Sequence, residues 1–144
     1  MKIRAALAGE SQILAEIDAL HPFSAHWSSS QIQSEMAAPA AHVLVAQTGE
    51  QVAGFIIFRA AGGVGEIVDL AVHPAFLRRG IGALLVRQAL DVMRQAKTEQ
   101  VTLEVHENNL PAQGLYLKQG FRVLGRRKKF YHNAQDALIM GTDL

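Results

Sequence analysis

Residues 77–83, Leu-Arg-Arg-Gly-Ile-Gly-Ala, combine two arginines with two glycines. The segment follows the apolar run of residues 67–72 and precedes a run with helical spacing of apolar residues. A glycine-rich turn between a strand and a helix exposes backbone N–H groups, and the helix dipole adds partial positive charge there. Arginines at a helix start oppose that dipole unless an anion is bound. These residue types therefore indicate a phosphate-binding turn.

Known phosphate-binding patterns narrow the kind of ligand. The Walker A pattern needs Gly-x4-Gly-Lys-Ser/Thr, which the chain lacks. The dinucleotide pattern Gly-x-Gly-x-x-Gly needs a third glycine where Leu85 stands. A further pattern, Gln/Arg-x-x-Gly-x-Gly/Ala, matches Gly80 and Gly82, with Leu77 at its first position. An ordinary glycine-rich turn before a surface helix is the alternative to all of these.

The elements around this turn predict an α+β fold. Alternating or apolar runs predict strands at residues 2–6, 42–46, 52–58, 66–72, 101–106, 121–124 and 137–140. Apolar residues at helical spacing predict helices after an N-cap at Ser11 and over residues 30–37, 80–96 and 110–119. Helices come first, then a three-strand antiparallel meander, then alternation, and this order disfavours a doubly wound fold. We expect a three-layer α/β/α arrangement, with a mixed, mostly antiparallel sheet and helices on both faces.

Composition restricts the class of protein. The chain has 144 residues, of which 49% are hydrophobic and 19% charged, with net charge +1, as expected for one globular domain over residues 1–144. This charge gives no reason to expect direct binding of nucleic acid. The absence of cysteine excludes a disulfide scaffold and a cysteine nucleophile, and the scattered histidines predict no metal. Without a membrane-spanning run or a signal peptide, we expect a cytoplasmic protein with no membrane partner.

A second pattern lies downstream of the turn. Asn109, Ala112, Leu115-Tyr116 and Gly120-Phe121 are spaced as N-x-x-A-x-x-L-Y-x-x-x-G-F. With residues 66–83, this pattern resembles the Gcn5-related N-acetyltransferase (GNAT) superfamily over roughly residues 60–144. The resemblance makes the turn a coenzyme A pyrophosphate site and implies acetyl-CoA as co-substrate. The coenzyme-binding residues that it implies are Leu70, Ala71, Val72, Arg78, Arg79, Gly80, Ile81, Gly82, Ala83 and Asn109.

Within that superfamily, the chain is most similar to the RimI-type ribosomal-protein alanine N-acetyltransferases. The similar features are Leu103-Glu104-Val105 with Tyr116, Arg126-Arg127-x-x-Phe130-Tyr131, residues 136–140, and His21-Pro22-Phe23 with Trp27-Ser28. The likeness implies that the acceptor is the N-terminal alanine of a small-subunit ribosomal protein, and we expect a monomer or weak dimer. A GNAT enzyme for a small amine or a lysine side chain is one alternative. A non-catalytic, coenzyme-A-binding regulatory module is another.

Two side chains are the candidates for proton transfer. Glu104 is the only carboxylate within residues 101–105 and shares a strand face with Thr102 and His106. We predict it to be the general base, with a solvent-facing strand glutamate as the alternative. Tyr116, with an ordinary phenol pKa of about 10, is predicted to protonate a thiolate of pKa about 8.5. The alternative for Tyr116 is a core tyrosine.

Backbone groups complete the predicted site. The resemblance implies that the N–H groups of Leu70 and Val72 receive the thioester carbonyl and the pantetheine arm. Asn109 either bonds the coenzyme arm or caps the helix that follows it. The basic run of residues 126–129 is predicted to be a solvated hairpin end, with a coenzyme 3′-phosphate contact or proximity to ribosomal RNA as alternatives.

Overall fold

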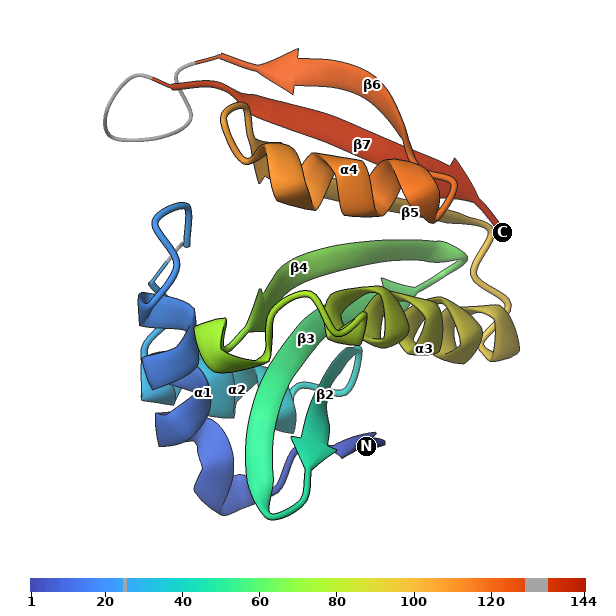
Figure 1. Ribbon diagram of the computed structural model, residues 1–144. Helices are drawn as coiled ribbons and strands as arrows, with labels where there is room; N and C mark the ends of the chain where they lie inside the picture. Colours follow the sequence, from blue (N-terminus) through green and yellow to red (C-terminus); the bar gives the residue numbers. More distant parts are fainter. Residues whose placement is uncertain (25, 129–134) are drawn as a thin grey trace.

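The computed structural model describes residues 1–24, 26–128 and 135–144. Within them, one sheet of seven strands has the order β1-β2-β3-β4-β5-β7-β6 (Figure 1). The strands are β1 (Lys2–Ala5), β2 (Ala41–Thr48), β3 (Gln51–Ala61), β4 (Val64–Val72), β5 (Gln100–His106), β6 (Arg122–Arg127) and β7 (Ala137–Asp143). The helices are α1 (Ser11–Ala19), α2 (Ser29–Ala37), α3 (Ile81–Gln95) and α4 (Leu110–Lys118). Among these helices, none is long and apolar enough to cross a membrane.

Helices cover both faces of the sheet, as the sequence predicted. Along β3, Phe55 and Ile57 pack with α1 and α2, whereas Ile56 and Phe58 pack with α3. All four side chains are fully buried. Each contributes about 1.5–3 kcal/mol through removal of apolar area from water. The period-2 pattern of this strand therefore holds the two helical layers on opposite sides of one sheet.

The predicted elements are all present, and the differences lie at their ends. Glu10, not Ser11, is the N-cap of α1, and α2 begins one residue early because the Ser28 hydroxyl accepts a hydrogen bond from the Gln31 N–H. β6 and β7 extend beyond their predicted ends because polar residues such as Arg126 and Asp143 also pair in this part of the sheet. Lys129 of the predicted basic run, and Phe130 and Tyr131 of the RimI-like feature, lie outside the described residues.

The sheet opens between its two central strands. All neighbouring strands are antiparallel except β4 and β5, which are parallel. Residues Val64 to Ile67 of β4 pair with Gln100 to Leu103 of β5. Beyond these pairs, both strands continue, β4 to Val72 and β5 to His106, and their described residues form no further ladder. Figure 1 shows the resulting separation of β1–β4 from β5–β7 and α4.

Candidate active site

The turn before α3 has an unusual backbone. Arg78 and Gly80 have left-handed conformations, with φ of 63° and 75°. Such a conformation costs a residue other than glycine about 1–2 kcal/mol, so Arg78 is held there by its surroundings. Gly80 is the N-cap of α3 and offers no side chain to its first N–H groups. Those donors are therefore available to an external anion.

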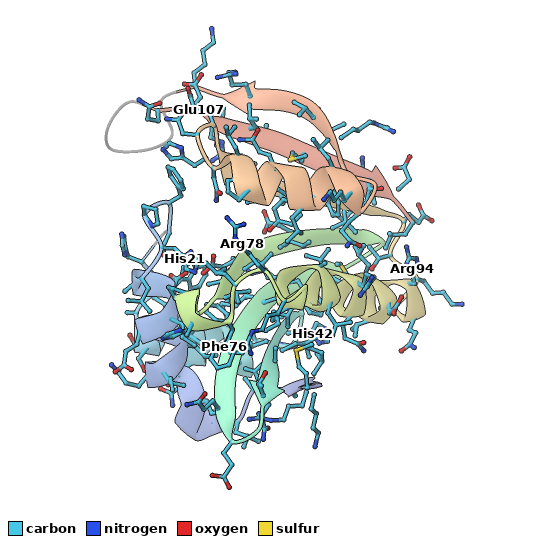
Figure 2. All side chains as sticks on the ribbon, in the orientation of Figure 1. His21, His42, Phe76, Arg78, Arg94 and Glu107 are labelled. Carbon is cyan, nitrogen blue, oxygen red and sulfur yellow. The ribbon has the colours of Figure 1, made fainter. Side chains whose placement is uncertain are left out.

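A groove begins at this turn. A hollow of about 530 Å³ lies between the start of α3 and α4. From the predicted coenzyme set it is lined by Val72, Arg78, Gly80, Ile81, Gly82 and Ala83. Gly82 permits the close approach of the two helices, because a Cβ there would lie 2.9 Å from Leu115 Cδ1. Figure 2 shows Phe76 and Arg78 in the segment that connects β4 to α3.

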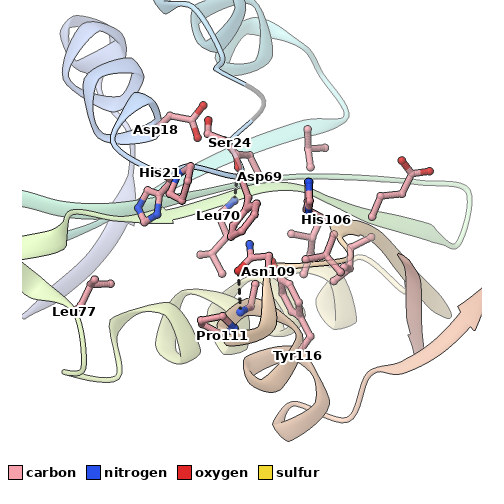
Figure 3. A pocket seen from close by; sticks show the side chains of 18 residues that line it. Asp18, His21, Ser24, Asp69, Leu70, Leu77, His106, Asn109, Pro111 and Tyr116 are labelled. Carbon is pink, nitrogen blue, oxygen red and sulfur yellow. Dashed lines mark hydrogen bonds between the residues drawn. The ribbon is translucent and has the colours of Figure 1, made fainter. Parts of the chain in front are cut away.

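A second cavity, of about 300 Å³, lies where β4 and β5 separate (Figure 3). Of the predicted site residues, Leu70, Glu104, Asn109 and Tyr116 line it. Leu77 and Pro111 line both hollows, so a ligand on the turn can extend toward Glu104 and Tyr116. Leu77, which stands where the coenzyme turn usually has Gln or Arg, thus lies where the two hollows meet.

The two candidates for proton transfer differ in their surroundings. The Glu104 side chain is 26% exposed, and its Oε1 lies 2.7 Å from Nη2 of Arg127. Tyr116 is buried, and its ring packs on that of Phe121 with centroids 5.6 Å apart. Burial, and secondarily the Asp69 carboxyl, raise the pKa of the Tyr116 phenol well above its usual range. Tyr116 is therefore a neutral phenol at physiological pH.

The backbone groups of β4 are already engaged by side chains. The Leu70 N–H donates to Oδ1 of Asp69 at 2.9 Å. The Val72 carbonyl lies 2.7 Å from Nε2 of His21. Both groups are thus directed away from β3, toward the opening. A ligand that used the Leu70 N–H would have to share it with Asp69 or displace Asp69.

Asn109 is the N-cap of α4. Its Oδ1 accepts a hydrogen bond from the Ala112 N–H at 3.3 Å. The helix-capping alternative is thus confirmed, and a hydrogen bond donated to the coenzyme would come from the Nδ2 amide.

Two residues of the predicted coenzyme set do not line either hollow. Arg79 places its guanidinium over the Phe76 ring, 5.3 Å from the centroid, and does not line the groove. Ala71 belongs to the core on the α1 and α2 side of the sheet. Alternation along β4 explains the position of Ala71, because neighbouring residues of a strand face opposite sides.

The cavity also contains ionisable residues that sequence reasoning missed. Asp18, His21, Asp69 and His106 all line it. The sequence pattern could have indicated two of these residues. Asp69 interrupts the apolar run of residues 67–72, and Asp18 follows Leu14 by one helical turn, on the buried face of α1. The His106 ring also contacts Phe23, at 4.6 Å between centroids, so the loop after α1 reaches β5 across the opening.

Two arginines of the basic run are paired with carboxylates. Arg126 lies 2.9 Å from Asp136 and 3.4 Å from Glu107, and Arg127 pairs with Glu104. Through Glu104, Arg127 is connected to the cavity, whereas the partners of Arg126 do not line it. Among the described residues, no group of His, Asp and Glu could hold a metal ion.

Sequence comparison places the chain in one family. Residues 12–121 match the Acetyltransferase (GNAT) family model, and the chain belongs to this family. It is 31% identical to the N-alpha-acetyltransferase RimI of Mycobacterium tuberculosis, over 98% of this chain and 91% of that protein. It is also 31% identical to a candidate ribosomal protein bS18-alanine N-acetyltransferase of Bacillus subtilis, over 97% of this chain and 96% of that protein.

Solved structures agree on the fold. The ribosomal-protein-S18-alanine N-acetyltransferase of Escherichia coli superimposes with a TM-score of 0.87 at 24% identity, covering 99% of this chain and 92% of that chain. The PaiA N-acetyltransferase of Thermoplasma acidophilum, in complex with coenzyme A, has a TM-score of 0.81 at 19% identity, covering 99% and 98%. The protein is a GNAT-family N-acetyltransferase, and this family uses acetyl-CoA.

Proposed function

We propose that the chain transfers the acetyl group of acetyl-CoA directly to the α-amine of a protein, the N-terminal alanine of a small-subunit ribosomal protein. The observation that carries the proposal is the pair of hollows joined at Leu77 and Pro111. One begins at the anion-binding turn and the other contains Glu104 and Tyr116. The names of the Bacillus subtilis and Mycobacterium tuberculosis relatives support the choice of acceptor. Residues 1–144 act as one catalytic domain in this proposal.

The donor side consists mainly of backbone. The first N–H groups of α3 and the Arg78 side chain bind the pyrophosphate of acetyl-CoA. The pantetheine arm follows the groove past Leu77 to the opening, where the Leu70 N–H receives the thioester carbonyl. The Asn109 amide, which lines the cavity, donates to the arm from the other wall.

The chemistry needs one base and one acid. The neutral amine attacks the thioester carbon, so that a C–N bond forms and the C–S bond breaks. Glu104 takes the amine proton, and Tyr116 gives its proton to the departing thiolate. An α-amine of pKa about 7.7–8.0 costs about 1.4 kcal/mol to neutralise at pH 7, whereas a lysine amine of pKa about 10.4 costs about 4–5 kcal/mol. One modest base therefore favours an N-terminal acceptor.

A panel of acceptors tests the proposal. Release of free thiol from acetyl-CoA is measured with a peptide that begins with alanine, an N-terminally blocked peptide that contains lysine, and a small polyamine. We expect turnover with the alanine peptide and none with its N-acetylated control. Turnover restricted to the lysine peptide or the polyamine would replace the proposed acceptor. Tight coenzyme binding without thiol release in any arm would instead support the regulatory module.

A further inference from the structure

Two carboxyl groups from distant parts of the chain meet at the wall of the β4–β5 cavity. Asp18 is on the buried face of α1, and Asp69 is in β4. Each has one oxygen with a backbone donor: Oδ2 of Asp18 accepts the Trp27 N–H at 2.9 Å, and Oδ1 of Asp69 accepts the Leu70 N–H at 2.9 Å. Figure 3 shows Asp69 at the Leu70 backbone and Asp18 on the α1 side of the same cavity.

The remaining oxygens, Oδ1 of Asp18 and Oδ2 of Asp69, are withdrawn from solvent and have no donor among the described residues. α1 packs against β4, and both carboxyl groups line the same cavity. Buried polar atoms are almost always hydrogen-bonded, and two adjacent buried carboxylates cannot both carry charge at low cost. A single proton between these two oxygens satisfies both requirements. In agreement, burial and then the Asp18 carboxyl raise the pKa of Asp69 well above its usual range.

We propose that Asp18 and Asp69 share one proton, and that the pair positions the loop that carries Trp27 against the strand that receives the thioester, with this loop forming the acceptor side of the opening. The hydrogen-bonded chain runs from the Trp27 N–H through Asp18 and Asp69 to the Leu70 N–H. Asp69 is a positioning residue here, acting through Leu70. A neutral Asp69 accepts the Leu70 N–H more weakly than a carboxylate would, so the thioester carbonyl can take over that donor.

Loss of the shared proton has two consequences. The two carboxylates repel each other and loosen the loop that carries Trp27, and the charged Asp69 holds the Leu70 N–H more firmly. Turnover should therefore fall at alkaline pH. The part of the proposal that concerns Leu70 and the acceptor rests on the proposed function. The shared proton itself does not.

Asp69→Asn and Asp69→Leu form a matched pair of variants. An asparagine amide donates to Asp18 and its oxygen still accepts from Leu70, without any titration. Leucine has a similar volume but neither bond. The other ionisable groups that line the cavity are His21, Glu104, His106 and Tyr116. These groups are the same in the variant and in wild type, so the ratio of Asp69→Asn to wild-type kcat/KM largely cancels their contribution.

We expect this ratio to be within a few-fold of one at neutral pH and to rise by up to about tenfold per pH unit once the pair has lost its proton. Asp69→Leu should raise the acceptor KM at every pH and leave the KM of acetyl-CoA nearly unchanged. A ratio that stays flat to pH 10, or equal acceptor KM values for leucine and asparagine, would overturn the positioning role.

The proton is detected separately by infrared difference spectroscopy of wild type against Asp69→Asn, without any substrate. We expect a protonated-carboxyl C=O band in wild type at pH 7 that the variant lacks; its absence would refute the shared proton. If the variants do not fold, wild-type protein with 13C-labelled aspartate still reveals a protonated aspartate, because the label shifts the frequency of its C=O band. A band present in a protein that acetylates no N-terminal peptide would contradict the proposed function and leave the pair intact.

Discussion

Tyr116→Phe separates proton donation from packing, because only the hydroxyl changes. The ring is 6% exposed and packs on Phe121, and its hydroxyl has no hydrogen bond to another described residue. Loss of that hydroxyl removes no internal hydrogen bond, so the free energy of unfolding should change by less than about 0.5–1 kcal/mol. Loss of a general acid lowers turnover about 10²–10⁴-fold, which corresponds to about 3–5 kcal/mol in the transition state.

The assay is kcat from thiol release at saturating acetyl-CoA and acceptor, beside the thermal unfolding midpoint. Because burial raises the pKa of Tyr116, the phenol stays protonated through neutral and mildly alkaline pH and should add no alkaline limb of its own. Phe121→Leu is the control: it disturbs the same packing, at about 1–3 kcal/mol, but removes no proton donor. Full turnover in Tyr116→Phe, or a loss of activity explained by unfolding, would refute the acid role.

Three further variants test other parts of the site and fold. Glu104→Gln should lower kcat about 10²–10⁴-fold with little change in coenzyme affinity, measured by calorimetry, and unchanged turnover would exclude the base role. Gly80→Ala should destabilise the protein by about 1–2 kcal/mol and weaken acetyl-CoA binding, because φ is 75° and an alanine there is strained although no atom lies within 4 Å of its Cβ. The control Gly62→Ala, between β3 and β4 with φ of 61° and equal space, should destabilise the protein similarly without weakening acetyl-CoA binding. Asp69→Asn should be more stable than wild type by a margin that grows with pH. The raised pKa of Asp69 stabilises folded wild type fully below about pH 4, and this stabilisation is lost as pH rises through the folded-state pKa. The free energy of unfolding falls by no more than about 1.4 kcal/mol per pH unit. A difference in unfolding free energy between Asp69→Asn and wild type that does not change with pH in urea titrations would contradict this.

Most of the fold could be predicted because local patterns determine it. The alternation of Phe55, Ile56 and Ile57 assigns each side chain to one face of β3, and the apolar stripe of α3 selects the face that packs on the sheet. The ends of helices and strands depend on weaker interactions than the burial of apolar side chains. A single hydroxyl, that of Ser28, determines where α2 begins, and edge pairing extends β6 to Arg127 despite its polar residues.

The site was predictable only where a motif contains its own geometry. Gly80 and Gly82 lie two residues apart at the start of α3, so their spacing in the sequence indicates the groove directly. Asp18 and Asp69 line one cavity because α1 packs against β4, and no local pattern encodes that packing. A motif also cannot assign roles residue by residue: Arg79 is adjacent to Arg78 but stacks on Phe76, because the left-handed residue before it redirects the chain.

The opening between β4 and β5 is the feature that joins the groove to the cavity, and its edges explain how it persists. A strand that loses its neighbour exposes backbone donors and acceptors that must find partners. Here side chains supply them, because Asp69 engages the Leu70 N–H and His21 engages the Val72 carbonyl. A side chain can turn away from such a bond, whereas a paired strand cannot. If the thioester binds as we propose, it needs to exchange only one hydrogen bond at Leu70, and the proposed protonation of Asp69 lowers the cost of that exchange.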